Sequence, residues 1–363
     1  MRIAFLGDIA LVGQFDSRIT HNIDERIAYL REILTKYDFV VANLESPFIS
    51  NNITTWVPKS MHLRADESSI SVLRKLCVNA VTLANNHIYD FGRKGVESTI
   101  KTLEREGIKW FGVDGKSIIE TIKNETISLS GFCCLSTNGF GYQKKINGRG
   151  VNILTRANLE GQVDADKTNN AVSIVSVHWG IEHTNYPAIE HVKLAESICG
   201  DKTVIIHGHH PHQIQGIQRT HESIIAYSLG NALFDRTISL NKKLSLELND
   251  ENRKSFVLGV EVNNGKIINY DITGFYLSEN GIMPYDITEE INEISAQLDK
   301  VQNPILYQNM RMLQYKSTLQ SKFGKHDFEW LMSRINYYSI GAKITSIFRN
   351  KRYRIEREKF MAN

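Results

Sequence analysis

The sequence carries little charge of one sign. Its 43 Lys and Arg residues nearly balance 40 Asp and Glu residues, and the formal net charge is +3 over 363 residues. A protein that binds nucleic-acid phosphates needs a dense basic patch. No run of Lys or Arg in the first 280 residues forms one. The composition therefore argues against nucleic acid as a partner.

Long hydrophobic runs and paired cysteines are also missing. No stretch approaches the roughly 18 uncharged apolar residues of a membrane span. The start, MRIAFLGDIALVGQF, lacks the features of a secretory signal. The cysteines Cys77, Cys133, Cys134 and Cys199 show no CxxC spacing, and neighbouring Cys133 and Cys134 would point to opposite faces of a strand. We therefore expect a cytoplasmic protein with reduced thiols in its core.

Alternating sequence patterns predict an α/β domain. Hydrophobic residues make up 42% of the chain, which is enough for a large core. Short β-branched runs alternate with helical periods, a pattern typical of α/β folds. The runs that predict strands are RIAFLGD, DFVVANLE, AVTLANN, IKWFGV, AVSIVSVHWG, TVIIHG and SIIAYSLGN. The helical periods lie around residues 27–34, 72–76, 96–107 and 194–198.

The pattern changes after Asp235. The runs FVLGVEV and KIINYDITGF flank Asn264-Gly265, a strong hairpin signal, so we expect antiparallel strands and a mixed sheet. From about Asp286 the chain becomes helical, with a break near Gly324. We predict a main domain over residues 1–285 and a separate helical extension over residues 286–363.

The last segment of the chain is basic. It contains Lys343, Arg349, Lys351, Arg352, Arg354, Arg357 and Lys359 against only Glu356 and Glu358. One interpretation is a solvated helix face or a frayed terminus. The other is a contact with an anionic membrane or a partner enzyme, which would place the protein at the inner face of the membrane.

Six predicted strands end in Asp, Glu, Asn or His. These strand-end residues are Asp8, Asn43 with Glu45, Asn85 with Asn86 and His87, His178, the histidines of HGHHPH, and Asn231. Ligands of open α/β sheets bind at the carboxyl ends of strands, so we expect these side chains to meet. Carboxylate, amide and imidazole groups without thiolates favour one or two divalent ions such as Mn²⁺, Zn²⁺ or Fe. Two such ions can clamp a phosphoryl group.

A third of the 12 histidines lie in HGHHPH, at His207, His209, His210 and His212. Pro211 would fix the backbone so that His210 and His212 face the metal site. His207 would face the other side of its strand and join the core. The remaining histidines are interpreted as structural, with His183 as an alternative residue of the pocket.

These motifs closely resemble those of the CapA family, associated with poly-γ-glutamate capsule synthesis. The matching segments are GD at 7–8, NLE at 43–45, LANNHIYDFG at 83–92, VHWGIE at 177–182, GHHPH at 208–212 and YSLGN at 227–231. The domain of that family resembles a calcineurin-like metallophosphoesterase fold. The resemblance therefore implies a four-layer αββα sandwich with mixed sheets, followed here by the helical extension.

The resemblance also implies a role for each residue. The implied metal ligands are Asp8 and His212 on the first ion, Asn86, His178 and one of His209 or His210 on the second, and Glu45 as the bridge. His87 would give a proton to the leaving group, and Asp90 would orient His87. The expected substrate contacts are Asn43, Asn85, Trp179, Glu182 and Asn231.

One departure from the family pattern leaves three functions open. Phosphoesterases of this fold carry DxH at the first strand, but the third position here is Ala10. The first hypothesis is a phosphoesterase-type hydrolase that acts on a cell-surface polymer or its phosphorylated precursor. The second is an enzyme that cleaves or transfers an amide of poly-γ-glutamate. The third is a non-catalytic assembly protein, favoured by Ala10 and the basic C-terminal segment. Family members in capsule export are often membrane-anchored, whereas this chain begins at its first strand, so we expect an intracellular or peripherally attached variant.

Overall fold

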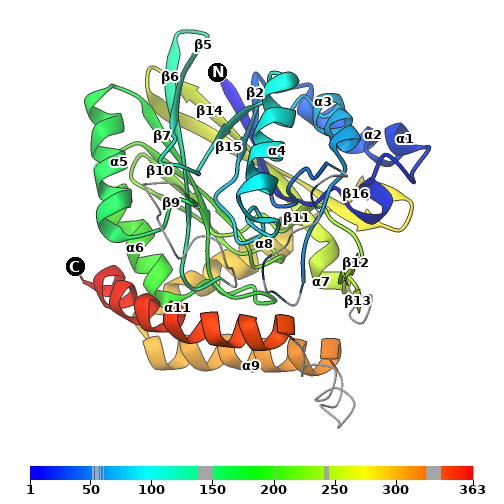
Figure 1. The fold of residues 1–363 in the computed structure, drawn as a ribbon. Coiled ribbons are helices and arrows are strands. Elements are labelled where there is room, and N and C mark those ends of the chain that lie inside the picture. Colours follow the sequence, from blue (N-terminus) through cyan, green and yellow to red (C-terminus); the bar gives the residue numbers. More distant parts are fainter. Residues whose placement is uncertain are drawn as a thin grey trace.

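The structure is a computed structural model that describes residues 1–50, 53, 57, 59, 61–137, 150–200, 202–240, 245–323 and 337–362. Two β-sheets pack face to face, and helices cover both outer faces (Figure 1). Three buried apolar clusters separate the layers: one between the sheets and one beneath the helices on each side. The predicted four-layer αββα sandwich is confirmed.

The first sheet contains both parallel and antiparallel strands. Its strands are β1 (Arg2–Ile9), β2 (Phe39–Leu44), β3 (Ala80–Thr82), β4 (Lys109–Phe111), β11 (Asn231–Leu233), β14 (Lys254–Asn263), β15 (Lys266–Ser278) and β16 (Gly281–Pro284). Their order is β16-β15-β14-β1-β2-β3-β4, and β11 also pairs with β1. The β14–β15 hairpin turns at Asn264 and Gly265, with φ of 51° and 71°, as a type I′ turn requires. The predicted hairpin and mixed sheet are confirmed.

The second sheet is parallel at its centre and antiparallel at its edges. Its strands are β5 (Ile118–Ile122), β6 (Glu125–Cys133), β7 (Val172–His178), β8 (Val204–His209), β9 (Ile217–Thr220) and β10 (Ser223–Ala226). Their order is β5-β6-β7-β8-β10-β9. A short separate pair is formed by β12 (Thr237–Ile238) and β13 (Ser245–Leu246).

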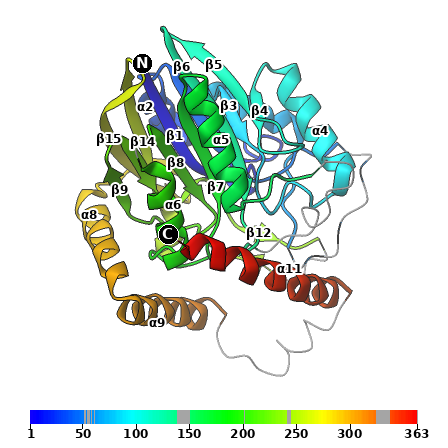
Figure 2. The ribbon, with the colours of Figure 1, turned by 90° about the vertical axis from the view of Figure 1, so that its left-hand side faces the viewer.

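Alternating side chains on β1 show how the layers form. Phe5 points into the core between the sheets, whereas Ala4 and Leu6 face the helices outside the first sheet. The helical segments outside this sheet and at its edge are η1 (Gly13–Phe15), α1 (Ile23–Arg26), α2 (Ala28–Leu34), η2 (Glu67–Ser69), α3 (Ile70–Lys75), α4 (Gly92–Arg105) and α7 (Asp250–Arg253). The second sheet is covered by α5 (Arg156–Thr168) and α6 (Ile189–Cys199) (Figure 2).

The cysteines agree largely with the sequence prediction. All four are free thiols, and Cys133, Cys134 and Cys199 are buried, whereas Cys77 is exposed. Cys133 joins the core beneath the first sheet's helices, and Cys134 joins the core outside the second sheet. The two neighbours therefore point to opposite sides, as predicted.

The C-terminal helices pack on the sandwich. They are α8 (Thr288–Ala296), η3 (Gln297–Gln302), α9 (Pro304–Phe323) and α11 (Tyr337–Met361). Ile287 and Ile291 join the core between the sheets, and Tyr307 and Phe360 are fully buried against the second sheet's outer layer. The division at residue 286 stays a prediction, and the predicted break near Gly324 lies outside the described residues. Within the described ranges, no helix combines the length and apolarity needed to cross a bilayer.

Two predicted strands end earlier than expected. β3 stops at Thr82, because Asn85 folds the following residues into a turn through its backbone bond to the Leu83 carbonyl. β10 stops at Ala226, and the chain then crosses to the first sheet, where Asn231 pairs in register with Asp8. The second difference brings the end of YSLGN beside the end of β1.

Candidate metal centre

The carboxyl ends of the strands converge on Asp8. Asn43 and Asn231 are its register partners on the neighbouring strands β2 and β11. Asn43 Nδ2 donates a hydrogen bond to Asp8 Oδ1 at 2.7 Å, and the backbone N–H of His210 donates to Oδ2 at 3.2 Å. Three strand ends that are distant in sequence thus meet at one carboxylate.

Two glycines make this convergence sterically feasible. A Cβ on Gly7 would lie 2.0 Å from the Gly230 carbonyl oxygen, and a Cβ on Gly208 would lie 2.0 Å from that of Tyr227. Neither position can carry a side chain without moving the backbone. The glycines of the GD and GHHPH motifs therefore let Asp8 and His209 approach the centre.

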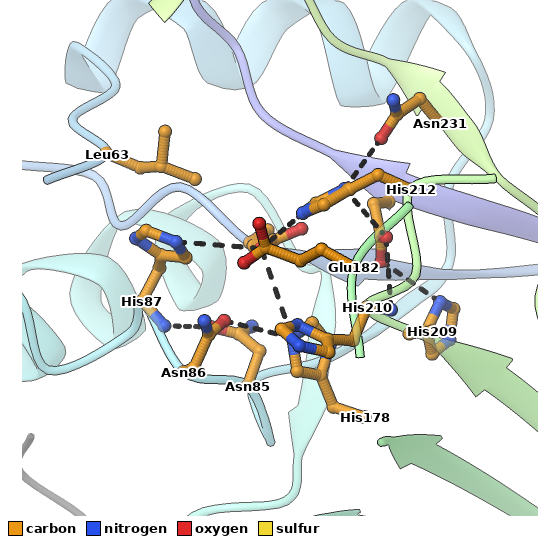
Figure 3. Close-up of polar contacts among 12 residues, drawn as sticks. Leu63, Asn85, Asn86, His87, His178, Glu182, His209, His210, His212 and Asn231 are labelled. Carbon is orange, nitrogen blue, oxygen red and sulfur yellow. Dashed lines mark hydrogen bonds and ion pairs between the residues drawn. The ribbon is translucent and has the colours of Figure 1, made fainter. Parts of the chain in front are cut away.

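Glu45 lies at the middle of the centre. Its side chain is fully buried, and neither carboxylate oxygen has a hydrogen-bond partner among the described residues. The nearest imidazole nitrogens to Glu45 Oε1 are the Nε2 atoms of His212 at 3.7 Å, His87 at 3.8 Å and His178 at 3.9 Å. Figure 3 shows these three histidines around a common centre. Burial raises the pKa of Glu45 to about 8.

His212 joins Glu45 to Asp8. Its Nδ1 lies 2.9 Å from Asn231 Oδ1 and 3.3 Å from Asp8 Oδ2. Burial lowers the pKa of His212, but attraction to Glu45 and Asp8 outweighs burial and raises it. Burial also opposes ionisation of Asp8, but contacts with His209 and His212 hold the pKa of Asp8 well below its usual value. Without a cation, protonated His212 therefore supplies the positive charge that these carboxylates need.

The second group of ligands surrounds His178. Its Nε2 lies 2.9 Å from Asn86 Oδ1, and its ring lies 4.8 Å from that of His210 between centroids. Burial lowers the pKa of His178 well below the usual value, so the ring is neutral and can coordinate a cation.

The structure separates the two candidate histidines of the HGHHPH segment. His209 Nδ1 faces Asp8 Oδ1 at 3.3 Å, and its ring contacts His207 at 4.0 Å between centroids. His210 faces His178 instead, from a backbone with φ of 96°. His212 has φ of 55°, so both residues around Pro211 adopt a conformation that is costly for non-glycine residues and common at functional sites. The geometry favours His210 as the ligand beside His178.

Glu182 belongs to the same cluster. Ligand atoms of Glu182, His210 and His212 lie within 4.8 Å of one another, and so do those of Asp8, Glu45 and His212. The sequence interpretation assigned Glu182 to substrate. Because a carboxylate at this spacing is also a suitable metal ligand, Glu182 is a ligand candidate that the sequence analysis missed.

His87 and Asp90 form a buried pair at the edge of the centre. His87 Nδ1 lies 2.7 Å from Asp90 Oδ2, which leaves Nε2 on the side of Glu45. Lys59 Nζ contacts Asp90 Oδ1 at 2.9 Å and His87 Nδ1 at 3.1 Å, and donates to the Asn86 carbonyl at 2.8 Å. Burial, and then Lys59, lower the pKa of His87. Sequence analysis missed Lys59, which belongs to none of the motifs.

The predicted substrate residues have different environments. Asn85 is buried: its Nδ2 donates to the Leu44 carbonyl, and its Oδ1 accepts from the backbone N–H groups of His87 and Ile88. It therefore shapes the loop that carries Asn86. Asn43 is also buried, and its Oδ1 accepts from Asn85 Nδ2 at 3.1 Å.

Trp179 does not lie at the centre. It is buried in the core outside the second sheet, stacks on His191 at 4.9 Å between centroids, and donates from Nε1 to the Tyr227 carbonyl. The structure thus differs from the prediction that Trp179 contacts substrate. The reason is strand alternation, since His178 precedes it and faces the centre.

Ala10 and His207 lie where the sequence suggested. Ala10 is buried in the core beneath the helices of the first sheet and supplies no ligand atom. His207 is fully buried, with its Nε2 2.8 Å from the Leu6 carbonyl oxygen and its Nδ1 3.1 Å from Ser176 Oγ. These hydrogen bonds confirm His207 as a core residue.

The residues of the centre fit one or two divalent cations. A buried carboxylate without a partner is destabilising, and a cation would supply the missing interaction. Both oxygens of Glu45 and the Nδ1 of His210 lack hydrogen-bond partners within the described part of the chain. The first ion would be held by Asp8, Glu45 and His212, and the second by Glu45, Asn86, His178 and His210. Oxygen and imidazole donors without thiolates suit Mn²⁺, Zn²⁺ or Fe.

Comparison with known proteins finds the family that the sequence motifs resemble. The family described as "Bacterial capsule synthesis protein PGA_cap" matches residues 2–236. PGA biosynthesis protein CapA of Bacillus subtilis (strain 168) is 28% identical over 242 residues, which are 64% of this chain and 63% of the relative. Capsule biosynthesis protein CapA of Bacillus anthracis is 27% identical over 259 residues, 68% of this chain and 62% of the relative.

Other similarities are more distant. A probable polyglutamine synthesis accessory protein of Mycobacterium tuberculosis, Rv0574c, is 25% identical over 250 residues, 63% of this chain and 65% of the relative. The matches thus span less than two thirds of the length of these relatives. A solved structure of a putative 5'-nucleotidase from Staphylococcus aureus in complex with alpha-ketoglutarate is 12% identical, with a TM-score of 0.46, over 83% of this chain and 58% of that chain.

The matched region includes every strand end of the candidate metal centre, from Asp8 on β1 to Asn231 on β11. It covers more than half of the chain. The chain therefore belongs to the PGA_cap family of bacterial capsule synthesis proteins.

Proposed function

We propose that this protein is a metal-dependent hydrolase of the phosphoesterase type that acts in the biosynthesis of a capsule or another cell-surface polymer. The observation that carries the proposal is the environment of Glu45. Its buried carboxylate has no hydrogen-bond partner among the described residues and has three imidazole nitrogens within 3.9 Å. A side chain so placed is costly to the fold, and a bound cation would offset this cost.

The chemistry follows from the ligand set and from the His87–Asp90 pair. Divalent cations in the centre would polarise a phosphoryl oxygen and lower the pKa of a water molecule. Asp90 holds Nδ1 of His87, so His87 Nε2 is the nitrogen that exchanges protons with the substrate. The lowered pKa of His87 makes its protonated form a good proton donor to a leaving oxygen. Lys59 places a positive charge beside the same pair and favours that release.

The substrate class is proposed from the named relatives. They are described as PGA biosynthesis and capsule biosynthesis proteins. We therefore propose a polymer of the cell surface, or its phosphorylated precursor, as the substrate.

Metal content and activity test the proposal together. The full chain is purified without chelator, its metals are quantified by mass spectrometry, and hydrolysis of an aryl phosphate, a phosphodiester and a glycan-linked phosphate is assayed before and after chelation. We expect one or two Mn, Zn or Fe ions per chain, and activity that returns when the metal is restored. Glu45→Gln should lose both properties.

The matched control is Glu125→Gln, which changes a buried carboxylate outside the centre and should keep metal and activity. Purified chain that binds no divalent ion, or that binds ions but hydrolyses none of these phosphoesters, would contradict the proposal.

A second candidate function is cleavage or transfer of an amide of poly-γ-glutamate. The words "PGA biosynthesis" and "polyglutamine synthesis accessory" in the names of the relatives favour it. A metal centre polarises an amide carbonyl as well as a phosphoryl oxygen. Adding a γ-glutamyl oligomer to the assay distinguishes the two functions, since metal-dependent cleavage of this substrate alone would favour the amide-cleaving enzyme.

The third function is a non-catalytic assembly role, which the absence of a ligand at Ala10 favours. Purified chain that contains no metal would support this role.

A further inference from the structure

The helix α11 has a buried face that docks it on the sandwich. The residues that recur on this face are Arg349, Tyr353, Glu356 and Phe360. Phe360 is fully buried in the core outside the second sheet, and Tyr353 Oη donates to Glu190 Oε1 of α6 at 2.8 Å. The spacing of three and four residues places these side chains on one side of the helix. The orientation of α11 about its own axis is therefore fixed.

The opposite side of α11 is an exposed apolar stripe. Its residues, with their exposed fractions, are Ile340 (51%), Ile344 (52%), Ile347 (62%), Phe348 (66%) and Ile355 (52%). At about 100° per residue these positions fall within an arc of roughly 100°, turned away from Phe360. Several large apolar side chains exposed along one side of a helix are typical of a binding surface rather than of free solvent-exposed protein.

Basic residues flank this stripe. Lys343, Arg352 and Arg354 are exposed at its edges, and Lys351 is exposed within its arc. Residues 337–362 contain seven Lys or Arg and two Glu, although the formal charge of the whole chain is only +3. Of the two acidic residues, Glu356 accepts from Lys359 Nζ at 2.8 Å. The apolar stripe is therefore bordered by positive charge that the rest of the chain does not share.

We infer that α11 is an interfacial helix that lies flat on an anionic lipid bilayer. Its apolar stripe would enter the boundary between headgroups and acyl chains, and its basic flanks would contact anionic headgroups. The helix carries too much charge to cross the bilayer, in agreement with the absence of a spanning helix from the described ranges. Charge complementarity selects the bilayer over a second copy of this chain, because two copies would bring like charges together.

The helical extension also touches the rim of the metal centre. Gln314 Oε1 of α9 accepts from Thr184 Oγ1 and from the backbone N–H of Asn185, both at 2.9 Å. These residues follow Glu182 in the loop after β7. Both α9 and α11 run along the end of the sandwich at which the loops of the centre lie (Figures 1 and 2). A chain bound through α11 would therefore carry the metal centre close to the membrane surface.

Vesicle binding of the full chain tests this inference. Co-sedimentation is measured with vesicles of phosphatidylglycerol mixed with phosphatidylcholine, and with vesicles of phosphatidylcholine alone. We expect binding to the anionic vesicles that falls as salt rises. The double variants Ile347→Ser/Phe348→Ser and Lys351→Glu/Arg354→Glu should each weaken binding by about tenfold or more.

Matched controls alter the same residue types elsewhere. Ile119→Ser/Ile268→Ser changes exposed isoleucines on β5 and β15, and Lys94→Glu/Lys101→Glu changes exposed lysines on α4. Both controls should bind like the unaltered chain, and circular dichroism establishes that every variant is folded. Equal partitioning of all folded variants would overturn the inference. So would a dimer in light scattering that becomes a monomer in Ile347→Ser/Phe348→Ser without any vesicle binding, since a second copy would then cover the stripe. Neither readout depends on hydrolase activity.

Discussion

Two buried carboxylates at opposite ends of the sandwich have contrasting surroundings. Glu125 begins β6 and accepts hydrogen bonds from the backbone N–H groups of Asn264 and Gly265, at 2.7 and 2.9 Å. Glu45 follows β2 and has no such partner within the described residues. The Glu125 carboxylate thus holds the turn of the β14–β15 hairpin in place and stabilises the fold. The Glu45 carboxylate lacks hydrogen-bond partners among the residues that the structure describes, which a bound cation would replace, so the comparison separates a structural residue from a candidate ligand.

The largest expected effect is that of Glu45→Gln. The amide keeps the shape of the side chain but removes the charge that a cation needs. Affinity for Mn²⁺ or Zn²⁺ should fall by more than about 100-fold, and metal-dependent activity should disappear. The measurements are isothermal titration calorimetry and the phosphoesterase assay.

The same variant should gain stability at neutral pH when metal is absent. Burial raises the pKa of Glu45 to about 8, so the folded chain retains a proton that the unfolded chain would release, whereas the amide of Gln has no proton to retain. Urea unfolding of the chelated chain measures this gain. Unchanged cation affinity in Glu45→Gln would contradict the proposal that Glu45, unlike Glu125, is a ligand of the cation.

The next effect concerns proton transfer. His87→Ala removes the side chain that Asp90 orients, so kcat should fall by about 10²- to 10⁴-fold. The metal content should remain that of the unaltered chain, because the implied ligands are untouched. If His87→Ala lost metal as well as activity, His87 would instead be a metal ligand. Asp90→Asn is the companion variant and should alter the pH profile of kcat.

A smaller effect is expected at the rim. Glu182→Gln should weaken cation binding by about tenfold, since Glu182 lies with His210 and His212 but is partly exposed. The exposed residue Glu279 provides the control Glu279→Gln, which should bind cations normally. Equal cation affinities of Glu182→Gln and Glu279→Gln would contradict a ligand role for Glu182 and favour the substrate contact predicted from the sequence.

Glu125→Gln should affect stability alone. Replacing the carboxylate weakens two charge-assisted hydrogen bonds, so the free energy of unfolding should fall by about 2 to 3 kcal/mol. Urea unfolding with saturating metal measures this loss, and calorimetry should find cation affinity unchanged. Altered affinity would mean that the two ends of the sandwich are coupled.

The last effect distinguishes a structural histidine from those of the centre. Burial lowers the pKa of His191 to about 4, so the unfolded chain binds a proton between about pH 6.5 and 4 that the folded chain does not. Stability should therefore fall as the pH falls through this window. Between pH 7 and 5 the chelated chain should lose about 2 kcal/mol more than His191→Phe. Parallel pH dependence of the two chains would contradict the assignment.

Much of this architecture could be predicted because it depends on local patterns. Apolar runs located most strands, and the polar residues that end them located Asp8, Glu45 and His178. Convergence followed from a general property of α/β sheets. Roles that depend on contacts across the fold were harder to predict. Lys59 reaches Asp90, 31 residues further along the chain, and no motif marks it.

The errors at Trp179 and AVTLANN have local causes. Trp179 follows His178 at the end of β7, so alternation turns its ring toward the outer core. Asn85 ends the strand early because its side chain accepts hydrogen bonds from the backbone N–H groups of His87 and Ile88 and donates one to the Leu44 carbonyl on β2. The difference between His209 and His210 depends on a backbone with positive φ, which the sequence alone does not specify.

The bonds of Gln314 to the loop after β7 have a mechanical consequence. Gln314 also donates to Asn185 Oδ1. One side chain on α9 therefore makes hydrogen bonds to both the backbone and the side chains of that loop. Glu182 lies only two residues before Thr184. A displacement of α9 would thus move the loop that carries Glu182, so the helical extension is mechanically linked to the rim of the candidate metal centre.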